Sequence, residues 1–179
     1  LNGDGEIASK LIERATSKFL PNGYPESVEK GYGAFSVFQF FASSCSSALM
    51  VLSTQTLLVA IGLTSGEALG LSATLNWVIK DGVGQFGGIL FANYLGKHHE
   101  FDSDPKKWRM ISGLALDAAC MIELAAPLLP SGTFLLSASI ANVGKNISFL
   151  SASASRAAIH QSIAKKQNLA DITAMAVSQ

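Results

Sequence analysis

Two residues of opposite charge, Lys80 and Asp81, interrupt a long stretch of the sequence that is otherwise uncharged. Glycines follow them at once, and the spacing Gly82-x-Gly84-x-x-Gly87 matches the glycine pattern of a dinucleotide-binding loop. Residues of these types support two chemistries. One is a glycine loop that holds a phosphate group, and the other is a charged pair inside a packed or membrane-embedded helix.

A dinucleotide site needs more than these glycines. The fingerprint requires a buried strand before the glycines, a helix after them, and an acidic residue about 20 positions further on that binds the ribose. Residues 70–80 instead carry apolar side chains at helix-compatible spacing, and Glu100 and Asp102 fall in a loop before another segment. We therefore interpret the glycines as helix-packing and bending residues, and we predict no dinucleotide site.

Further charges lie at a similar depth in other apolar segments. Lys80, Asp117 and Lys145 each lie 12 or 13 residues into their segments, which is about 18–20 Å along a helix. Unpaired, each would cost at least about 2.5–3.5 kcal/mol at the centre of a bilayer. We therefore predict that Lys80 and Asp81 face inward and pair with Asp117 and Lys145. With flanking polar residues, the candidate cluster comprises Asn76, Lys80, Asp81, Gln85, Asp117, Asn142, Lys145 and Asn146.

This cluster has two interpretations. Intramembrane ionisable groups are functional candidates by default, which favours a polar site. Buried ion pairs are weak evidence for stability, so the charges could equally serve only helix register. A Schiff base on Lys80 or Lys145 is chemically feasible, although nothing in the sequence specifies it. We predict no catalytic residue, and whether the protein is an enzyme stays open, with a non-enzymatic role favoured.

Cysteine and histidine residues give no support for a metal site. Cys45 and Cys120 lie in separate apolar runs, where we expect buried, reduced thiols. The three histidines lack the spacing of known ligand sets. The sequence therefore predicts no metal and specifies no cofactor-binding residue.

Four long, mostly apolar segments must position the cluster. Alternation typical of strands is scarce, so we predict an all-α fold, a helical bundle embedded in a membrane and preceded by a short amphipathic helix over residues 6–20. Asp104 followed by Pro105 is typical of a helix start. We predict helices over residues 34–63, 67–95 (interrupted or kinked near Gly82 to Gly84), 105–126 and 133–161.

We divide the chain into three parts: an N-terminal polar or amphipathic segment (1–33), a helical domain (34–164) and a polar C-terminal segment (165–179). The helical domain is expected to be incomplete. We also expect any targeting segment to lie outside this chain.

Charge distribution favours the membrane interpretation. If the four segments each cross a bilayer, 11 of the 13 basic residues fall on or near one side and none on the other, as the positive-inside rule expects. Short turns of soluble helix hairpins also lack basic residues by chance, so a soluble bundle is the alternative. The balance of 13 basic and 13 acidic residues gives no reason to expect nucleic acid as a partner.

Small residues recur at helical spacing in two segments. They allow helix backbones to approach closely, which is how membrane helices usually associate. We predict that the helix-packing residues are Gly82, Gly84, Gly88, Gly144, Ser148, Ser151 and Ser155.

Several motifs in fixed order resemble the root UV-B sensitive (RUS) family, whose domain is also named for vitamin B6 photo-protection and homoeostasis. They include "FLPNGYPESV" (19–28), "ATLNWVIKDGVGQFGGILFA" (73–92), "NVGKNISFLSASASRAAIH" (142–160) and "NLADITA" (168–174). The resemblance covers nearly the whole chain from Phe19 onward. It implies roles in vitamin B6 balance, UV-B response and auxin-linked development, in plastids or other organelle membranes.

The leading hypothesis is therefore a helical membrane protein that supports small-molecule homeostasis or transport, with vitamin B6 compounds implied by the resemblance. Its expected partners are membrane lipid and a family paralogue or a second copy. The first alternative is a non-catalytic scaffold that binds a paralogue or an aminotransferase-type partner. The second is a soluble helical protein linked to pyridoxal phosphate, a cofactor implied by family association alone.

Overall fold

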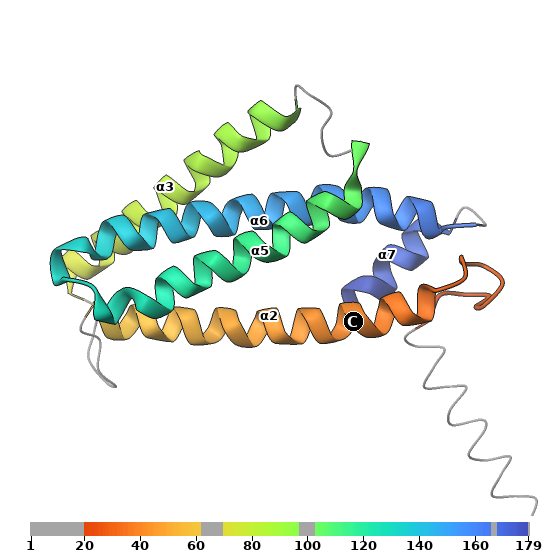
Figure 1. Cartoon of the computed structure of the whole chain (residues 1–179), viewed down its shortest axis with the longest axis horizontal. Helices are drawn as coiled ribbons and strands as arrows, with labels where there is room; N and C mark the ends of the chain where they lie inside the picture. The colour runs from red at the N-terminus through yellow and green to blue at the C-terminus, as the bar shows by residue number, and fades with distance from the viewer. Residues whose placement is uncertain (1–19, 62–69, 97–102, 166–167, 179) are drawn as a thin grey trace, which may run out of the picture. The chain divides into compact units, whose positions relative to one another are not determined.

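The computed structural model describes residues 20–61, 70–96, 103–165 and 168–178. Within these ranges the protein is all-helical, as predicted, and contains no β-strand beyond an isolated bridge between Val28 and Ala164. Figure 1 shows the α-helices, which are α2 (Tyr32–Ala60), α3 (Leu71–Gly96), α5 (Pro105–Ala125), α6 (Phe134–Ile163) and α7 (Leu169–Ser178).

The four long helices lie close to the predicted segments. Helix α5 begins as predicted, because the Asp104 side chain accepts a hydrogen bond from the Lys107 backbone N–H and Pro105 occupies the first turn. Two short 3₁₀ helices, Ala126–Leu128 and Ser131–Thr133, replace α-helix at the predicted break between α5 and α6.

Two features differ from the sequence-based expectation. Helix α3 is not interrupted at its glycines, because the backbone is α-helical from Leu71 to Gly96. The polar C-terminal segment contains a helix, α7, which was not predicted because it is only 10 residues long. The expected amphipathic helix over residues 6–20, apart from its last residue, lies outside the described residues, as do residues 62–69, where the first predicted long helix ends and the second begins.

The chain divides into two units, and helices α2 and α6 contribute residues to both. The terminal unit comprises Leu1–Ser44 with Ile159–Gln179, and the central unit comprises Cys45–Ala158. In the terminal unit, α7 lies beside the start of α2 (Figure 1). Its core joins Val28 and Tyr32 to Ile172 of α7, which is fully buried.

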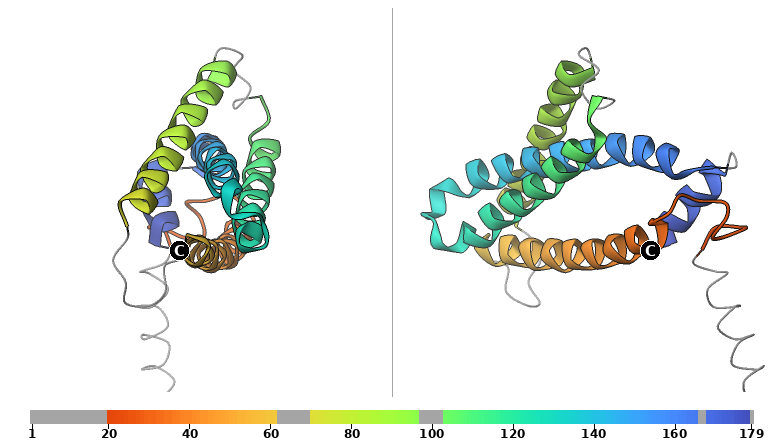
Figure 2. Two further views of the ribbon diagram at one scale, coloured as in Figure 1. Left: turned by 90° about the vertical axis from the view of Figure 1, so that its left-hand side faces the viewer. Right: turned by 45° about the vertical axis from the view of Figure 1, so that its right-hand side comes forward.

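In the central unit, α6 lies between α3 and α5, as the end-on view in Figure 2 shows. A small apolar cluster joins several segments of this unit. It combines Leu57 of α2, Ala126 after α5 and Ala138 of α6, with Trp77 packed against them.

Glycines allow α3 to approach α6 closely. A Cβ added at Gly84 would lie 2.7 Å from Cγ of Asn142, and one at Gly87 would lie 2.8 Å from both methyl carbons of Val143. Such distances are shorter than real carbon contacts allow, so side chains at these positions would push the helices apart. Gly82 was predicted to pack as well, but it is exposed and a Cβ there would meet nothing within 4 Å. It points away from α6, two residues before Gly84 on the helix.

Small residues also line the contact between α5 and α6. A Cβ at Gly144 would lie 3.1 Å from that of Ala119, and Ser148 Oγ donates a 2.6 Å hydrogen bond to the Ser112 carbonyl. Ser151 and Ser155 are buried on the same helix. Short side chains therefore bring these two backbones together, as small residues do in membrane helix pairs.

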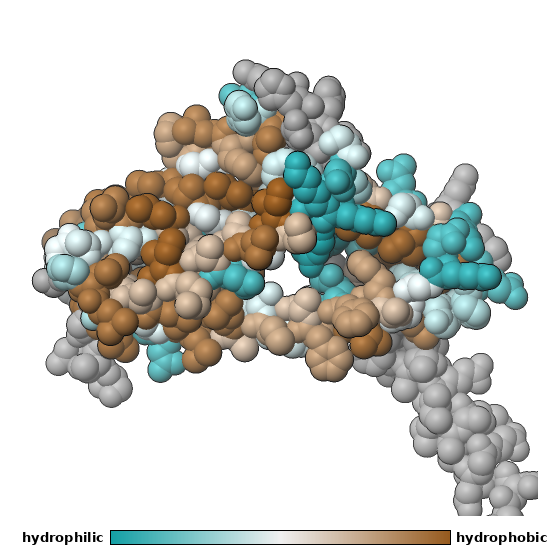
Figure 3. Space-filling view, viewed as in Figure 1, coloured by the Kyte–Doolittle hydropathy of each residue, from teal (hydrophilic) through white to brown (hydrophobic). Residues whose placement is uncertain are grey.

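The exterior of the central unit is rich in large apolar side chains. Leu71, Val78, Phe86 and Ile89 are exposed along α3. On α5 and α6, Met110, Leu114, Met121, Leu136 and Ile140 are exposed too. Figure 3 shows hydrophobic residues covering much of the face that it presents. Cys120 is buried as expected, whereas Cys45 is exposed because it lies on an outward face of α2.

Two described helices are long and apolar enough to cross a membrane by length and composition: Tyr32–Ala60 and the stretch Pro105–Leu128, each with a mean hydropathy of 1.5. Within the 18-residue apolar stretch of each helix, only 6% of the first and 33% of the second is buried. Core helices of soluble proteins also pass this test, but they are mostly buried.

Candidate functional site

A buried ion pair lies in the middle of the central unit. Lys145 of α6 donates to the carboxylate of Glu123 on α5 and, at 3.2 Å, to the Ser53 hydroxyl on α2. Ser53 in turn donates to the Met50 carbonyl at 3.1 Å. Three helices thus contribute to one network, which we call the Lys145 network (Lys145, Glu123 and Ser53).

All three side chains are withdrawn from solvent. The residues are 7%, 1% and 0% exposed for Lys145, Glu123 and Ser53 respectively. Charges in such surroundings need close partners, because the loss of hydration is not otherwise offset. Here each charge has an opposite charge in contact, and the ammonium has a second acceptor.

A second polar network joins α3 to α6. Lys80 pairs with its neighbour Asp81 and lies 4.7 Å from the ring centroid of Trp77, a cation–π distance. The Asn142 amide donates to the Lys80 carbonyl and to the Asp81 carboxylate, both at 3.1 Å. The Lys80 side chain is 6% exposed and that of Asp81 is 51% exposed. This Lys80 network therefore opens to the surface on its acidic side.

The predicted cross-pairing of the four mid-depth charges is wrong. Lys80 pairs with Asp81, and Lys145 pairs with Glu123, a residue that the sequence analysis did not include. Asp117 is exposed and makes no ion pair with any described residue. Helical geometry explains the error. At about 100° per residue, Asp117 projects roughly 120° away from the centre of the buried stripe of α5.

That stripe contains the signal that could have found Glu123. The buried residues of α5 follow one another at spacings of three and four, with one adjacent pair. Glu123 lies three residues after Cys120 and so continues this series, whereas Asp117 is not a member of it. Equal depth in the segment was the wrong criterion, because it ignores which face of the helix a residue occupies. The buried stripe is Trp108, Ser112, Leu116, Ala119, Cys120 and Glu123.

The remaining candidates divide between interior and surface. Asn76 is half-buried on α3, and Asn146 donates to the Asn142 carbonyl at 2.9 Å within α6. Gln85 is exposed, so it is no part of an interior cluster. Gln85 and Asn146 both line an open groove of about 340 Å³ between α3 and α6, together with Ile89 and Phe149.

Comparison with known proteins gives one family. Residues 6–179 match the family model described as the vitamin B6 photo-protection and homoeostasis domain. The chain is 38% identical over 168 residues to "Protein root UVB sensitive 2, chloroplastic" of Arabidopsis thaliana, covering 94% of this chain and 37% of that protein. The chain belongs to the root UVB sensitive family.

Other RUS proteins match to a similar extent. "Protein root UVB sensitive 3" of Arabidopsis thaliana is 35% identical over 166 residues, which are 93% of this chain and 37% of that protein. "RUS family member 1" of Dictyostelium discoideum is 34% identical over 161 residues, 90% of this chain and 30% of that protein. The chain thus spans about a third of the length of these relatives. No solved structure matches it.

Chemically, the RUS chain offers two polar networks in a helical unit with few other interior charges. Both lysines are held in ion pairs, which gives no support to a covalent Schiff base. The described residues contain no group of three or more His, Cys, Asp or Glu side chains that could hold a metal. The arrangement is suited to binding a polar or charged group between helices, or to fixing how the helices pack.

Proposed function

We propose that the central unit is a helical bundle embedded in a membrane, and that this RUS chain is the membrane part of a protein supporting vitamin B6 homeostasis or transport. One observation carries the proposal: the Lys145 network is buried in a unit whose exterior is rich in large apolar side chains. This is the reverse of a soluble bundle, which places apolar residues inside and polar ones outside.

Burial in the candidate membrane helices supports the same conclusion. If α2 were the core helix of a soluble protein, most of its apolar window would be covered, yet only 6% is buried. Its Phe38, Phe41 and Val51 are between 61% and 74% exposed. In water, exposed apolar surface of this extent marks a partner or a membrane.

The vitamin B6 theme comes from the family description, and the structure supplies a chemistry that is compatible with it. Vitamin B6 compounds carry hydroxyl groups, a ring nitrogen and, in some forms, a phosphate or an amine. A buried lysine and glutamate with a serine hydroxyl can exchange hydrogen bonds with such groups. Ionisable groups inside membranes commonly mark substrate or proton pathways. A plastid or another organelle membrane is the proposed location, since one relative is named chloroplastic.

Alkaline carbonate extraction tests the membrane assignment. The tagged chain is expressed in cells, and the membranes are washed at high pH and sedimented. We expect the chain to stay in the pellet with an integral marker protein, while a peripheral marker is released. Release of the chain into the supernatant would overturn the assignment.

Uptake into proteoliposomes tests the transport role. We expect vesicles that contain the chain to accumulate labelled pyridoxal faster than empty vesicles, and Lys145→Met to remove most of the gain. Gly82→Ala is the matched control, because it alters an exposed position without a nearby contact. Uptake that is absent in the wild type, or equal in Lys145→Met, would refute transport through this network.

A second candidate function, a scaffold that binds a paralogue or a second copy, is favoured by one observation. Asp117 is exposed halfway along α5, a helix apolar enough to cross a membrane. A carboxylate facing lipid at that depth would cost about 2.5–3.5 kcal/mol. A partner chain that covers it would remove this cost. Co-purification of two differently tagged copies should then weaken in Asp117→Leu, whereas unchanged recovery would count against an interface there.

A further inference from the structure

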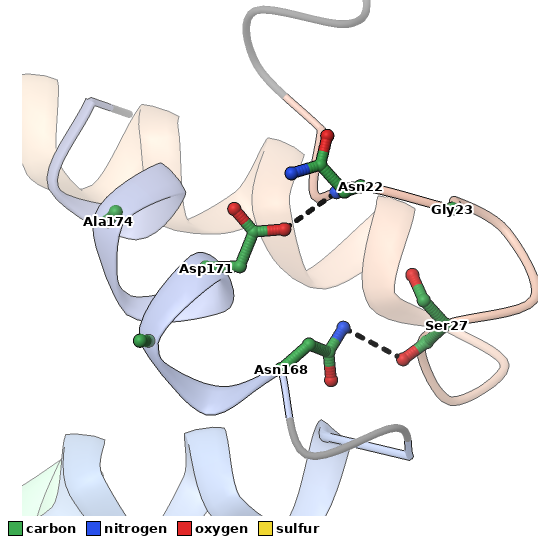
Figure 4. A pocket seen from close by; sticks show the side chains of 7 residues that line it. Asn22, Gly23, Ser27, Asn168, Asp171 and Ala174 are labelled. Carbon is green, nitrogen blue, oxygen red and sulfur yellow. Dashed lines mark hydrogen bonds between the residues drawn. The ribbon is translucent and has the colours of Figure 1, made fainter.

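A pocket in the terminal unit is formed by two segments that lie far apart in the sequence. One segment is 20–28, which carries "LPNGYPESV", and the other is the first turns of α7, which carry "NLADITA". The pocket has a volume of about 660 Å³. Its polar lining residues are Asn22, Ser27, Asn168 and Asp171 (Figure 4). None of them belongs to the Lys80 or Lys145 networks.

Direct bonds hold the two walls together. The Asn22 backbone N–H donates to Asp171 Oδ2 at 2.7 Å, and the Asn168 amide donates to the Ser27 carbonyl at 3.1 Å. Beneath them, Val28 packs in the same core cluster as Ile172 of α7. These contacts join residues 20–28 to α7 and so position the polar groups of the pocket.

Two buried polar atoms at this pocket have no hydrogen-bond partner: Ser27 Oγ and Asn168 Oδ1. Ser27 is only 3% exposed, and Figure 4 shows its hydroxyl directed into the space between Gly23 and α7. Buried polar atoms are nearly always bonded in folded proteins, so unpaired ones call for an explanation. The Ser27 hydroxyl is one such atom, and it lies in a pocket that a carboxylate also lines, which points to a ligand.

The hydrogen-bonding groups that line the pocket determine which kind of ligand it can bind. Asp171 accepts one bond, from Asn22, through one of its two oxygens. Asn168 Oδ1 is an acceptor, and the Ser27 hydroxyl can accept as well as donate. A lining with one negative charge and several acceptors suits a ligand that is positively charged and rich in N–H or O–H donors. Magnesium and calcium usually take six or more oxygen ligands, so a single carboxylate serves a metal poorly.

We propose that this pocket binds a small organic ligand through a protonated nitrogen placed on Asp171, with Ser27 Oγ bonding one of its hydroxyl or N–H groups. The other lining residues, Gly23, Ala170 and Ala174, have little or no side chain and leave room for a ring. Among vitamin B6 compounds, pyridoxamine has this chemistry: an amine that is protonated at neutral pH, a ring nitrogen and two hydroxyl groups. Naming it as the probe rests on the proposed function.

Binding of pyridoxamine to the purified, detergent-solubilised chain tests the proposal by isothermal titration calorimetry. We expect saturable binding of pyridoxamine and at least tenfold weaker binding of 4-pyridoxic acid, whose carboxylate would face Asp171. Asp171→Asn and Ser27→Ala should each weaken pyridoxamine binding about tenfold or more, because a charge-assisted bond or a buried bond is lost.

The variants are chosen so that the fold is kept. Asn at position 171 retains an oxygen acceptor for the Asn22 N–H, and Ser27→Ala breaks no bond within the described residues. Ser36→Ala is the matched control, since its hydroxyl is also buried and unpaired in the same unit but does not line the pocket. If Asp171→Asn fails to fold by circular dichroism, Ser27→Ala decides the question alone.

Three results would overturn the proposal: no binding of pyridoxamine, equal binding of 4-pyridoxic acid, or binding that both pocket variants leave unchanged. The transport role fails separately. Pocket-dependent binding without uptake into vesicles would remove the transport role alone. Uptake without any pyridoxamine binding would remove the pocket proposal alone.

Discussion

Replacing Glu123 with glutamine should destabilise the central unit strongly, because it removes the charge that neutralises Lys145. In the wild type, Lys145 contacts Glu123 and Ser53, and Glu123 is 1% exposed. Glutamine keeps the size of the side chain and one oxygen acceptor. The change therefore tests the charge pair with little change in packing.

The size of the expected loss in stability follows from the burial of Lys145, the charged partner that remains. Removing one member of a buried ion pair costs about 3–5 kcal/mol, because the other charge is left without compensation. The Ser53 hydroxyl, at 3.2 Å, is a neutral acceptor and cannot replace a carboxylate. For a chain of this size, 1 kcal/mol lowers the melting temperature by about 2–4 °C, so Glu123→Gln should lower it by about 6–20 °C.

Thermal unfolding of the detergent-solubilised protein, followed by circular dichroism or tryptophan fluorescence, measures this change. Glu29→Gln is the matched control, because it breaks a surface ion pair with Lys165 in which both side chains are 41–51% exposed. Exposed pairs contribute about 0–1 kcal/mol, so this control should move the melting temperature by only a few degrees. If the melting temperature of Glu29→Gln fell as far as that of Glu123→Gln, the assay would not distinguish the loss of a buried ion pair from the loss of an exposed one.

A double-mutant cycle completes the test. Once Glu123→Gln is present, Lys145→Met removes the orphaned charge, so the double variant should regain part of the lost stability. We expect a coupling energy above about 1 kcal/mol between the two positions. Effects that simply add, or a Glu123→Gln protein as stable as the wild type, would refute the buried pair as the organising feature of this unit.

Three further predictions concern the helix contacts, each measured by the same unfolding assay. Gly82→Ala should stabilise by up to about 1 kcal/mol, because alanine is the better helix former and nothing lies within 4 Å, whereas Gly84→Ala should destabilise by about 1–3 kcal/mol by displacing Asn142. The reverse order would contradict the close approach of α3 to α6. Ser148→Ala should cost about 1 kcal/mol through its 2.6 Å bond to a carbonyl of α5, and no loss would mean that this bond contributes nothing. Asp117→Asn should not lower the stability, since the side chain is exposed and has no ion pair with a described residue, and a clear loss would show that Asp117 lies in the interior.

Local signals predicted the elements well. Long apolar runs located the four long helices, and the Asp104–Pro105 pair located the start of α5 because capping is a short-range interaction between neighbouring residues. Helix α7 was not predicted, because a segment of 10 residues is too short for its apolar residues to show a clear helical period. Ile172 is buried only because residues from the other end of the chain cover it.

Site prediction failed where it depended on rotation about a helix axis. Lys80, Asp81 and Asn142 were placed in one cluster and do lie together, since α3 and α6 approach through their glycines. Lys145 was placed in the same cluster, yet it contacts other helices. Depth along a segment can be counted from the sequence, whereas the face that a residue occupies requires the whole buried stripe.

The Lys80 and Lys145 networks join different faces of α6 to different neighbouring helices. Asn142 reaches α3 on one face, and Lys145, three residues further on, reaches α5 and α2 on another. The contacts around them include many small residues, which allow the helix backbones to approach closely. A hydrogen-bonded charge tolerates little displacement, so each network fixes the height of α6 against one neighbour. Fixing register in this way needs only a satisfied pair, and the Lys145 network is one. The exposed carboxylate of Asp81 exceeds that need, so the Lys80 network also has a group left at the surface for an outside partner.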